Sequence, residues 1–131
     1  MKFLLFACFL MALAAPALAQ VPAASDPHLA ALAGRTCSYS GYSADSNYWW
    51  FYFTRSHGIM YIDPRLKYLS SSTTDLGRIA LQRQSATSYF FVTPWHIRFV
   101  MTPQASPSGL VVQRVWPNGS HDRPVTYPCS G

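Results

Sequence analysis

The stretch Tyr48–Thr54 reads YWWFYFT and is the strongest β-strand signal in the chain, because aromatic side chains favour the pleated, half-buried surface of a strand. Successive side chains of a strand point to opposite faces, so Trp49, Phe51 and Phe53 share one face. The other face carries three more rings, those of Tyr48, Trp50 and Tyr52. The strand is therefore either covered on two sides or presents an aromatic stripe to a ligand.

Turn residues divide the chain on both sides of this segment into further short strands, a pattern typical of an all-β fold. Asp63-Pro64 is expected to end one strand, and Arg65–Gly77 is expected to be a long surface loop with one helical turn at Arg65–Leu69. One helix is predicted, His28–Ala33, after the cap and proline of Ser25-Asp26-Pro27 and before Gly34. The predicted strands are Cys37–Tyr42, Tyr48–Thr54, Ile59–Ile62, Arg78–Gln84, Tyr89–Thr93, Trp95–Met101, Gly109–Trp116 and Pro124–Cys129.

The first 19 residues have the organisation of a secretory signal peptide. Lys2 supplies the positive region, Phe3–Leu13 is an unbroken apolar stretch, and Ala17-Leu18-Ala19 supplies small residues for the peptidase. We expect cleavage before Gln20, a single all-β domain over residues 20–131 and a periplasmic or secreted location. The apolar run is shorter than the roughly 20 residues that a membrane span needs, and no second candidate follows.

Cleavage removes Cys8 and leaves two cysteines, Cys37 and Cys129, which we expect to form one disulfide in an exported chain. Such a bond closes a loop of about 90 residues and is worth about 4–5 kcal/mol at most in the chain-entropy model. It also brings the first and last strands side by side, as a closed meander barrel requires. The sequence thus predicts a small antiparallel β-barrel of about eight strands with a short N-terminal helix, and a β-sandwich is the alternative.

Two groups of residues are candidates for a binding site. Tyr48, Trp50 and Tyr52 suit a sugar or a protein partner, because flat rings with polar edges bury a large area at low entropic cost. The alternative is that these rings belong to the core, or that the helix or the long loop covers them. His96 and Arg98 lie two residues apart on a predicted strand, so they share a face and either meet an anion together or form an ordinary solvated face.

Composition and spacing disfavour other functions. All five acidic residues are aspartates and most lie beside turn residues, so a pair of catalytic carboxylates is not expected. No His or Cys spacing matches a metal site, and no serine-hydrolase elbow is present. Without the leader the net charge is +4, with no run of Lys or Arg, which favours phosphate-bearing glycolipid or an acidic protein over nucleic acid. We expect no enzyme activity, no metal and no cofactor.

In outline, the predicted layout resembles two families of small exported barrels. Leu32–Thr36 enters the first strand after a short helix, as a Gly-x-Trp entry does in lipocalin-like barrels, with Thr36 at the tryptophan position. A single disulfide with a cysteine near each end resembles periplasmic inhibitors of c-type lysozyme, in which a Ser-Gly-x-x-Tyr-like loop plugs the cleft of the enzyme. Ser85–Tyr89 is similar to that loop without its glycine, which implies that Ser88 and Tyr89 would contact the lysozyme.

These observations predict a small exported monomer that binds a partner. As a binding protein it would hold an apolar ligand or dock a protein or glycan partner. The alternatives are an inhibitor of a cell-wall lytic enzyme and an envelope-associated structural protein with no ligand.

Overall fold

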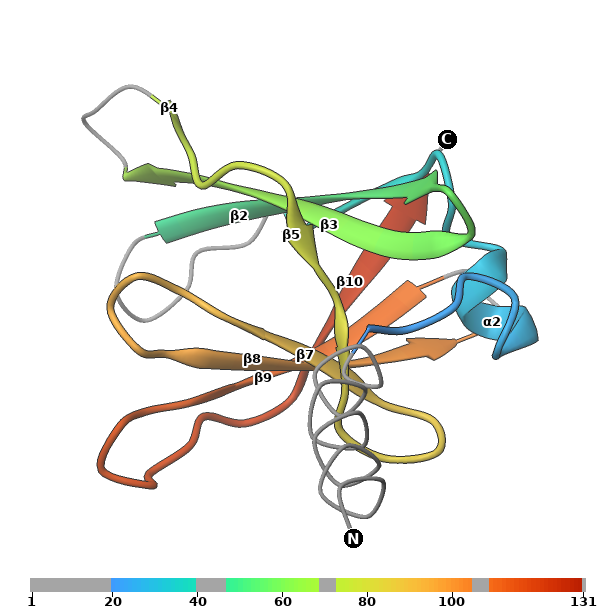
Figure 1. Cartoon of the computed structure of the whole chain (residues 1–131). Helices are drawn as coiled ribbons and strands as arrows, with labels where there is room; N and C mark the ends of the chain where they lie inside the picture. The colour runs from blue at the N-terminus through green and yellow to red at the C-terminus, as the bar shows by residue number, and fades with distance from the viewer. Residues whose placement is uncertain (1–19, 40–46, 69–72, 105–108, 131) are drawn as a thin grey trace, which may run out of the picture.

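The computed structural model describes residues 20–39, 47–68, 73–104 and 109–130, so the predicted signal peptide lies outside the described residues. The described chain forms ten strands and one short helix (Figure 1). The elements are α2 (Pro27–Ala30), β1 (Thr36–Ser38), β2 (Asn47–Ser56), β3 (Ile59–Tyr68), β4 (Thr73–Asp75), β5 (Ile79–Ala80), β6 (Gln82–Arg83), β7 (Tyr89–Val92), β8 (Arg98–Gln104), β9 (Gly109–Val115) and β10 (Val125–Ser130).

All strands belong to one antiparallel sheet in the order β4-β3-β2-β1-β10-β9-β8-β7-β6, and β5 pairs with β3. The sheet folds over, so that β2 and β3 face β7, β8 and β9 across a core and β10 crosses from one half to the other (Figure 1). It is not closed into a barrel, because the strands at the two ends of the order, β4 and β6, do not pair with each other within the described residues. The predicted barrel is therefore wrong. Two separate sheets do not form either, because β1 and β10 join the halves.

One short stretch, 79–83, contacts both edges of the folded sheet in succession. β5 pairs with β3 over two residues, Leu81 donates its N–H to the Met60 carbonyl, and β6 then pairs with β7 over two residues. A barrel would need lateral pairing along the length of its edge strands. Here the segment 79–83 pairs with β3 over two residues and then with β7 over two residues. It therefore links the two edges at one point and does not close the sheet along their length.

The predicted disulfide is confirmed. Cys37 on β1 and Cys129 on β10 are direct cross-strand partners with Cα atoms 4.0 Å apart, and their sulfurs are bonded. The first and last strands are therefore neighbours, as expected. Their position differs from the expectation, because they lie in the middle of the strand order and not at the seam of a cylinder.

Aromatic rings fill the space between the two halves of the sheet. The ring centroids of Phe51 (β2) and Phe99 (β8) are 5.9 Å apart, and the ring of Phe91 (β7) stacks on that of Phe99 with a centroid distance of 5.0 Å. These three side chains are fully buried, and Trp49 packs against Phe99 at 4.6 Å. The alternation of Tyr48–Thr54 thus sets the inner face as the sequence predicts. The interior between these strands is occupied by side chains.

The segment 63–77 differs most from the expectation. β3 continues through Pro64 to Tyr68, and β4 follows, where a loop with a helical turn was predicted. In an antiparallel strand the N–H and C=O of one residue point to the same side. The Pro64 carbonyl accepts from Leu76 N–H, on the side away from β2, so the missing proline N–H removes no bond to β2. The proline is therefore tolerated inside a paired strand.

The predicted strand Trp95–Met101 is also corrected in part. Its second half is β8, with Phe99 and Met101 buried, but residues 93–97 form a turn in which His96 has a φ of +64°. A turn breaks the alternation of faces, so His96 and Arg98 are not a same-face pair on one strand. The predicted strand Arg78–Gln84 is divided into β5 and β6, because the chain changes its partner strand at Leu81. Four other predicted strands coincide with β2, β7, β9 and β10 to within a few residues, and Cys37–Tyr42 begins in β1 and runs into residues outside the described part.

The predicted helix forms over a shorter span. The Asp26 carboxylate caps α2 by accepting the His28 N–H at 2.9 Å, and Pro27 occupies the first turn. The chain then turns at Gly34, whose φ of +79° favours glycine. Leu29 and Leu32 are buried, so this element closes one end of the core.

The residues just after the predicted cleavage site belong to the fold. Val21 accepts the Met60 N–H at 3.0 Å, and the Ala23 N–H donates to the Gly58 carbonyl at 2.8 Å. Both side chains are buried, and Gln20 forms a bridge with Gln82 of β6. The segment 20–23 therefore lies against the tip of the β2–β3 hairpin and the edge at β6.

Candidate functional site

The aromatic stripe predicted from the sequence lies on the face of β2 that points away from the core. Trp49, Phe51 and Phe53 are buried on the inner side. Three half-buried rings alternate with them and lie on the outer side, those of Tyr48, Trp50 and Tyr52. The helix does not cover this stripe, because α2 packs its leucine into the core at one end of the sheet (Figure 1).

Basic side chains of β3 lie directly beside the rings. The cross-strand partner of Tyr48 is Lys67, and that of Trp50 is Arg65. The Tyr48 and Trp50 rings are 6.4 Å apart and 27° from parallel, and the Arg65 guanidinium carbon lies 4.5 Å from the Tyr52 ring centroid. We call these five residues the β2–β3 outer face.

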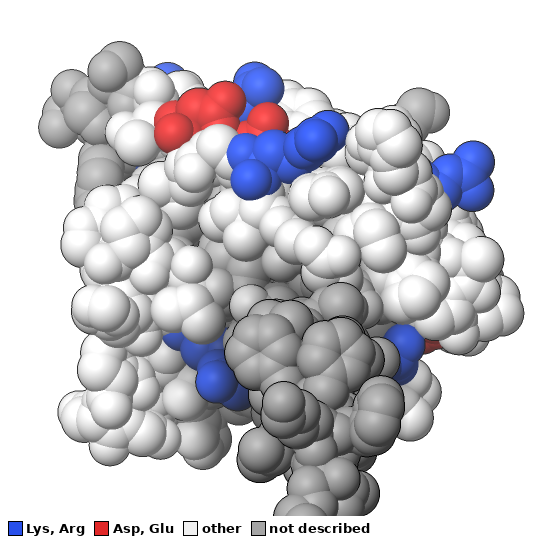
Figure 2. Space-filling view, in the orientation of Figure 1, with Lys and Arg blue, Asp and Glu red and all other residues white. Residues whose placement is uncertain are grey.

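Two aspartates position Arg65. Its nitrogens lie 3.9 Å from an Asp63 oxygen and 3.6 Å from an Asp75 oxygen. Burial raises the pKa of Asp63, and its interaction with the neighbouring Asp75 raises that pKa further, whereas the hydrogen bond from Asp63 lowers the pKa of Asp75. Acidic and basic groups accordingly lie side by side at the top of the molecule, over the half that holds β3 and β4 (Figure 2). The carboxylates balance the charge of Arg65 and hold it over Tyr52.

Arg65 and Lys67 are absent from the site predicted from the sequence, because the strand is expected there to end at Pro64. The signal that finds them is the continued alternation of polar and apolar residues through 60–67. Met60, Ile62 and Leu66 point inward and are buried. The outward positions carry Tyr61, Asp63, Arg65 and Lys67.

The two residues of the predicted anion pair, His96 and Arg98, belong to different local structures, a turn and a strand. His96 is exposed in the turn before β8. Arg98 lies over the Phe90 ring at 4.1 Å and donates to the Gln84 side chain at 2.9 Å. Arg98 therefore already has partners within the outer face of β7 and β8.

The two residues implied by the lysozyme-inhibitor resemblance have internal partners. Tyr89 is fully buried, and its hydroxyl donates to the Asp26 carboxylate at 2.8 Å. The Ser88 and Ser85 hydroxyls lie 2.6 Å apart within their own turn. Tyr89 thus connects β7 to the helix cap, and a partner would reach its ring only if the fold opened.

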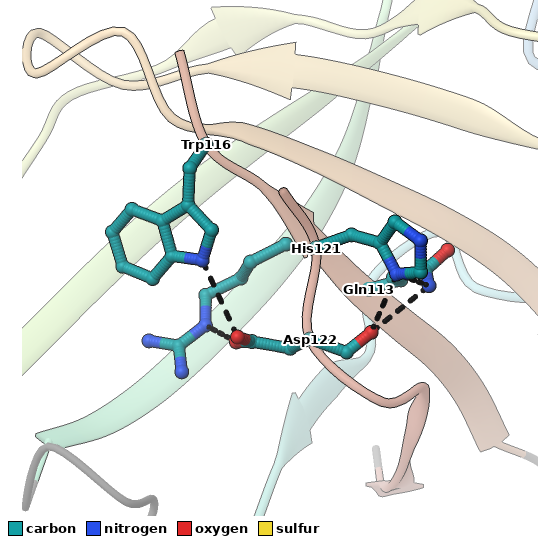
Figure 3. Close-up of polar contacts among 5 residues, drawn as sticks. Gln113, Trp116, His121 and Asp122 are labelled. Carbon is teal, nitrogen blue, oxygen red and sulfur yellow. Dashed lines mark hydrogen bonds and ion pairs between the residues drawn. The ribbon is translucent and has the colours of Figure 1, made fainter. Parts of the chain in front are cut away.

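A polar network follows β9 (Figure 3). The Asp122 carboxylate accepts from the Arg114 Nε and from the Trp116 indole N–H, at 3.3 Å for the latter. Gln113 donates to the Asp122 carbonyl at 2.9 Å, and the Gln113 amide nitrogen lies 3.1 Å from the His121 ring. These contacts link the side chains of β9 to the turn that precedes β10.

Within the ranges that the structure describes, no group of three His, Cys, Asp or Glu side chains is placed to hold a metal ion. In the same ranges, no helix has both the length and the apolar character needed to cross a membrane. Comparison of the chain with protein family models, with curated proteins and with solved structures gave no match.

Proposed function

We propose that this protein is an exported binding module that holds a glycan chain on the β2–β3 outer face. The observation that carries the proposal is the row of three half-buried rings on the outer face of β2, with Lys67 and the ion-paired Arg65 of β3 beside it. Positions i and i+4 of a strand are about 13 Å apart. The row is long enough to contact more than one sugar ring.

The chemistry of the row suits sugars. Aromatic faces pack on the C–H face of a pyranose, while the tyrosine hydroxyls and the indole N–H offer hydrogen bonds at the edges of the rings. Lys67 adds positive charge at one end of the row, whereas the charge of Arg65 is balanced by Asp63 and Asp75. An ammonium group binds carboxylate and phosphate substituents, and a guanidinium group offers further hydrogen-bond donors. We therefore favour a glycan that carries acidic groups, as cell-wall polymers do.

Export is supported by two features. The predicted leader precedes the domain, and the Cys37–Cys129 bond is consistent with an oxidising compartment outside the cytoplasm. The packing of Phe51, Phe91 and Phe99 favours a ligand on the surface over an apolar ligand between the layers, because the rings fill the space where such a ligand would lie.

The test is co-sedimentation of the purified protein with insoluble peptidoglycan, and with chitin as an uncharged comparison. We expect binding to peptidoglycan and at least a tenfold weaker affinity for Trp50→Ala, because central aromatic residues contribute about 2 kcal/mol or more to an interface. Phe90→Ala is the matched control, because Phe90 is a half-buried ring on the other half of the sheet. The proposal fails if the parent binds neither polymer, or if the two variants bind equally well.

A further inference from the structure

The turn between β7 and β8 presents the most exposed large apolar side chain of the described residues. Trp95 is 49% exposed, and Val92, at the end of β7, is 39% exposed. Pro94 lies between them and is exposed as well. Burying such a ring against a partner recovers a large apolar area.

The turn holds Trp95 in place before any partner binds. The Thr93 hydroxyl, which is buried, accepts the N–H groups of Trp95 and Ile97 at 3.3 and 3.2 Å. The Thr93 N–H also donates to the Ile97 carbonyl at 2.9 Å, and its carbonyl accepts the His96 N–H. These bonds maintain the left-handed His96 conformation, which is unfavourable for a residue other than glycine. Because the backbone of the turn is already ordered, binding a partner costs little further conformational entropy of this backbone.

Among the residues that the structure describes, the strands that hold this turn carry little negative charge. The sequence has no acidic residue from 76 to 121, and residues 82–130 contain four arginines and one aspartate, a net charge of +3. That aspartate is Asp122, which is paired with Arg114. Beside the turn, Val92, Arg98 and Val115 are successive cross-strand partners, and Val115 forms a bridge with His121. A cationic, partly apolar row therefore adjoins Trp95.

From these features we infer that the β7–β8 turn docks on the surface of an anionic lipid layer, with Trp95 at the level of the head groups. Tryptophan favours the membrane–water interface, since its ring is apolar and its N–H is polar. Arginine beside it attracts lipid phosphate, at about 1 kcal/mol per cation near the surface. A protein partner would need a matching cavity for the ring, whereas a lipid layer takes an exposed ring and the neighbouring row of apolar and basic side chains together.

The experiment is flotation of the purified protein with vesicles of phosphatidylcholine alone and with vesicles of an equal mixture of phosphatidylcholine and phosphatidylglycerol. We expect binding to the mixed vesicles, weaker binding to the neutral ones, a loss of binding as salt is added, and a blue shift of tryptophan emission. Trp95→Ala should remove the blue shift and weaken binding about tenfold or more, because the variant has no indole ring to bury in the lipid layer.

Charge variants separate this surface from general electrostatic attraction. Arg98→Gln is expected to weaken vesicle binding about fivefold, from the contribution of one cation near the surface. Arg55→Gln, an exposed arginine of β2 in the other half of the sheet, is the matched control and should bind as the parent does. Parent-like binding of Trp95→Ala overturns the inference. So does failure of the parent to bind either kind of vesicle.

Discussion

Replacing Tyr89 with phenylalanine removes a single buried hydrogen bond and should destabilise the protein by about 2 kcal/mol, since a bond to a charged group contributes about 1.5–3 kcal/mol. The ring is fully buried and its hydroxyl lies 2.8 Å from the Asp26 carboxylate. Water has little access to replace the lost donor, because Asp26 is only 8% exposed. For a domain of this size the midpoint of thermal unfolding should fall by roughly 8–10 °C.

The penalty should depend on pH in a defined direction. Burial raises the pKa of Asp26, but the Tyr89 hydroxyl, the amides of His28 and Leu29 and the charge of His28 together lower it below its ordinary value. A carboxyl with a depressed pKa in the folded state contributes stability above its unfolded-state pKa, and that contribution is lost as pH falls through the folded-state value. The difference between parent and Tyr89→Phe is therefore largest near neutral pH and shrinks below about pH 4.

The alkaline side gives an independent check. Burial and the hydrogen bond to Asp26 raise the pKa of Tyr89 above its ordinary value. A raised pKa means that the protonated tyrosine stabilises the fold, and this contribution is lost as pH rises from about 10 through the folded-state pKa. The parent should lose that stability in urea titrations above pH 10, and Tyr89→Phe should not.

Urea unfolding followed by far-UV circular dichroism measures all three expectations. Tyr39→Phe is the matched control, because Tyr39 is exposed and its substitution should change stability by less than about 0.5 kcal/mol. A double-mutant cycle with Asp26→Asn measures the coupling between the two side chains. A Tyr89→Phe penalty that equals the control, or one that stays constant down to pH 3, would refute the reasoning.

Three further changes test other features. His57 and Gly58 both have positive φ, as a two-residue hairpin turn of the Asn-Gly type requires, so His57→Asn should raise stability by about 0.5–1 kcal/mol, and a lower thermal midpoint would contradict this. Replacing Cys37 and Cys129 together with serine should lower the free energy of unfolding in urea by about 4–5 kcal/mol at most, and an unchanged melt would show that the bond does not stabilise the fold. Asp122→Ala removes the acceptor of Arg114 and Trp116 and should lower the free energy of unfolding by about 1 kcal/mol, given the partial exposure of the pair. Tryptophan emission should also change, and parent-like emission and stability would argue against the network.

Much of the local structure could be predicted from residue pattern and compartment. The faces of Tyr48–Thr54 follow from strict alternation, and the helix start follows from the cap at Asp26 and the proline after it. The disulfide follows from the cysteine count and the leader. In these cases one local signal, or one count, decides the outcome without knowledge of distant contacts.

The errors come from features that depend on distant partners. Pro64 predicts a strand end because its N–H is missing, and only the hydrogen bond from the Leu76 N–H to its carbonyl shows that no bond to β2 is lost. The turn at Thr93–Ile97 depends on a threonine hydroxyl that closes it, which a strand-like run of residues conceals. The open sheet depends on two-residue contacts of β5 and β6, which carry no signal in the sequence.

The candidate site shows the same division. The alternation of the strand predicts that Tyr48, Trp50 and Tyr52 share a face. Only the positions of α2 and β3 show that this face points away from the core. The exposure of Trp95 required knowledge of the turn, since the same residue in a continuous strand would share the buried face of Phe99.

The central place of β1 and β10 makes the whole sheet depend on one pairing between strands that lie far apart in the sequence. While β1 and β10 are apart, the chain holds two incomplete half-sheets with an open seam in the middle. Contacts this far apart in sequence form slowly. We therefore expect the joining of the two halves to limit the rate of folding, and a lesion in β10 to separate the halves of the sheet as well as to weaken one strand.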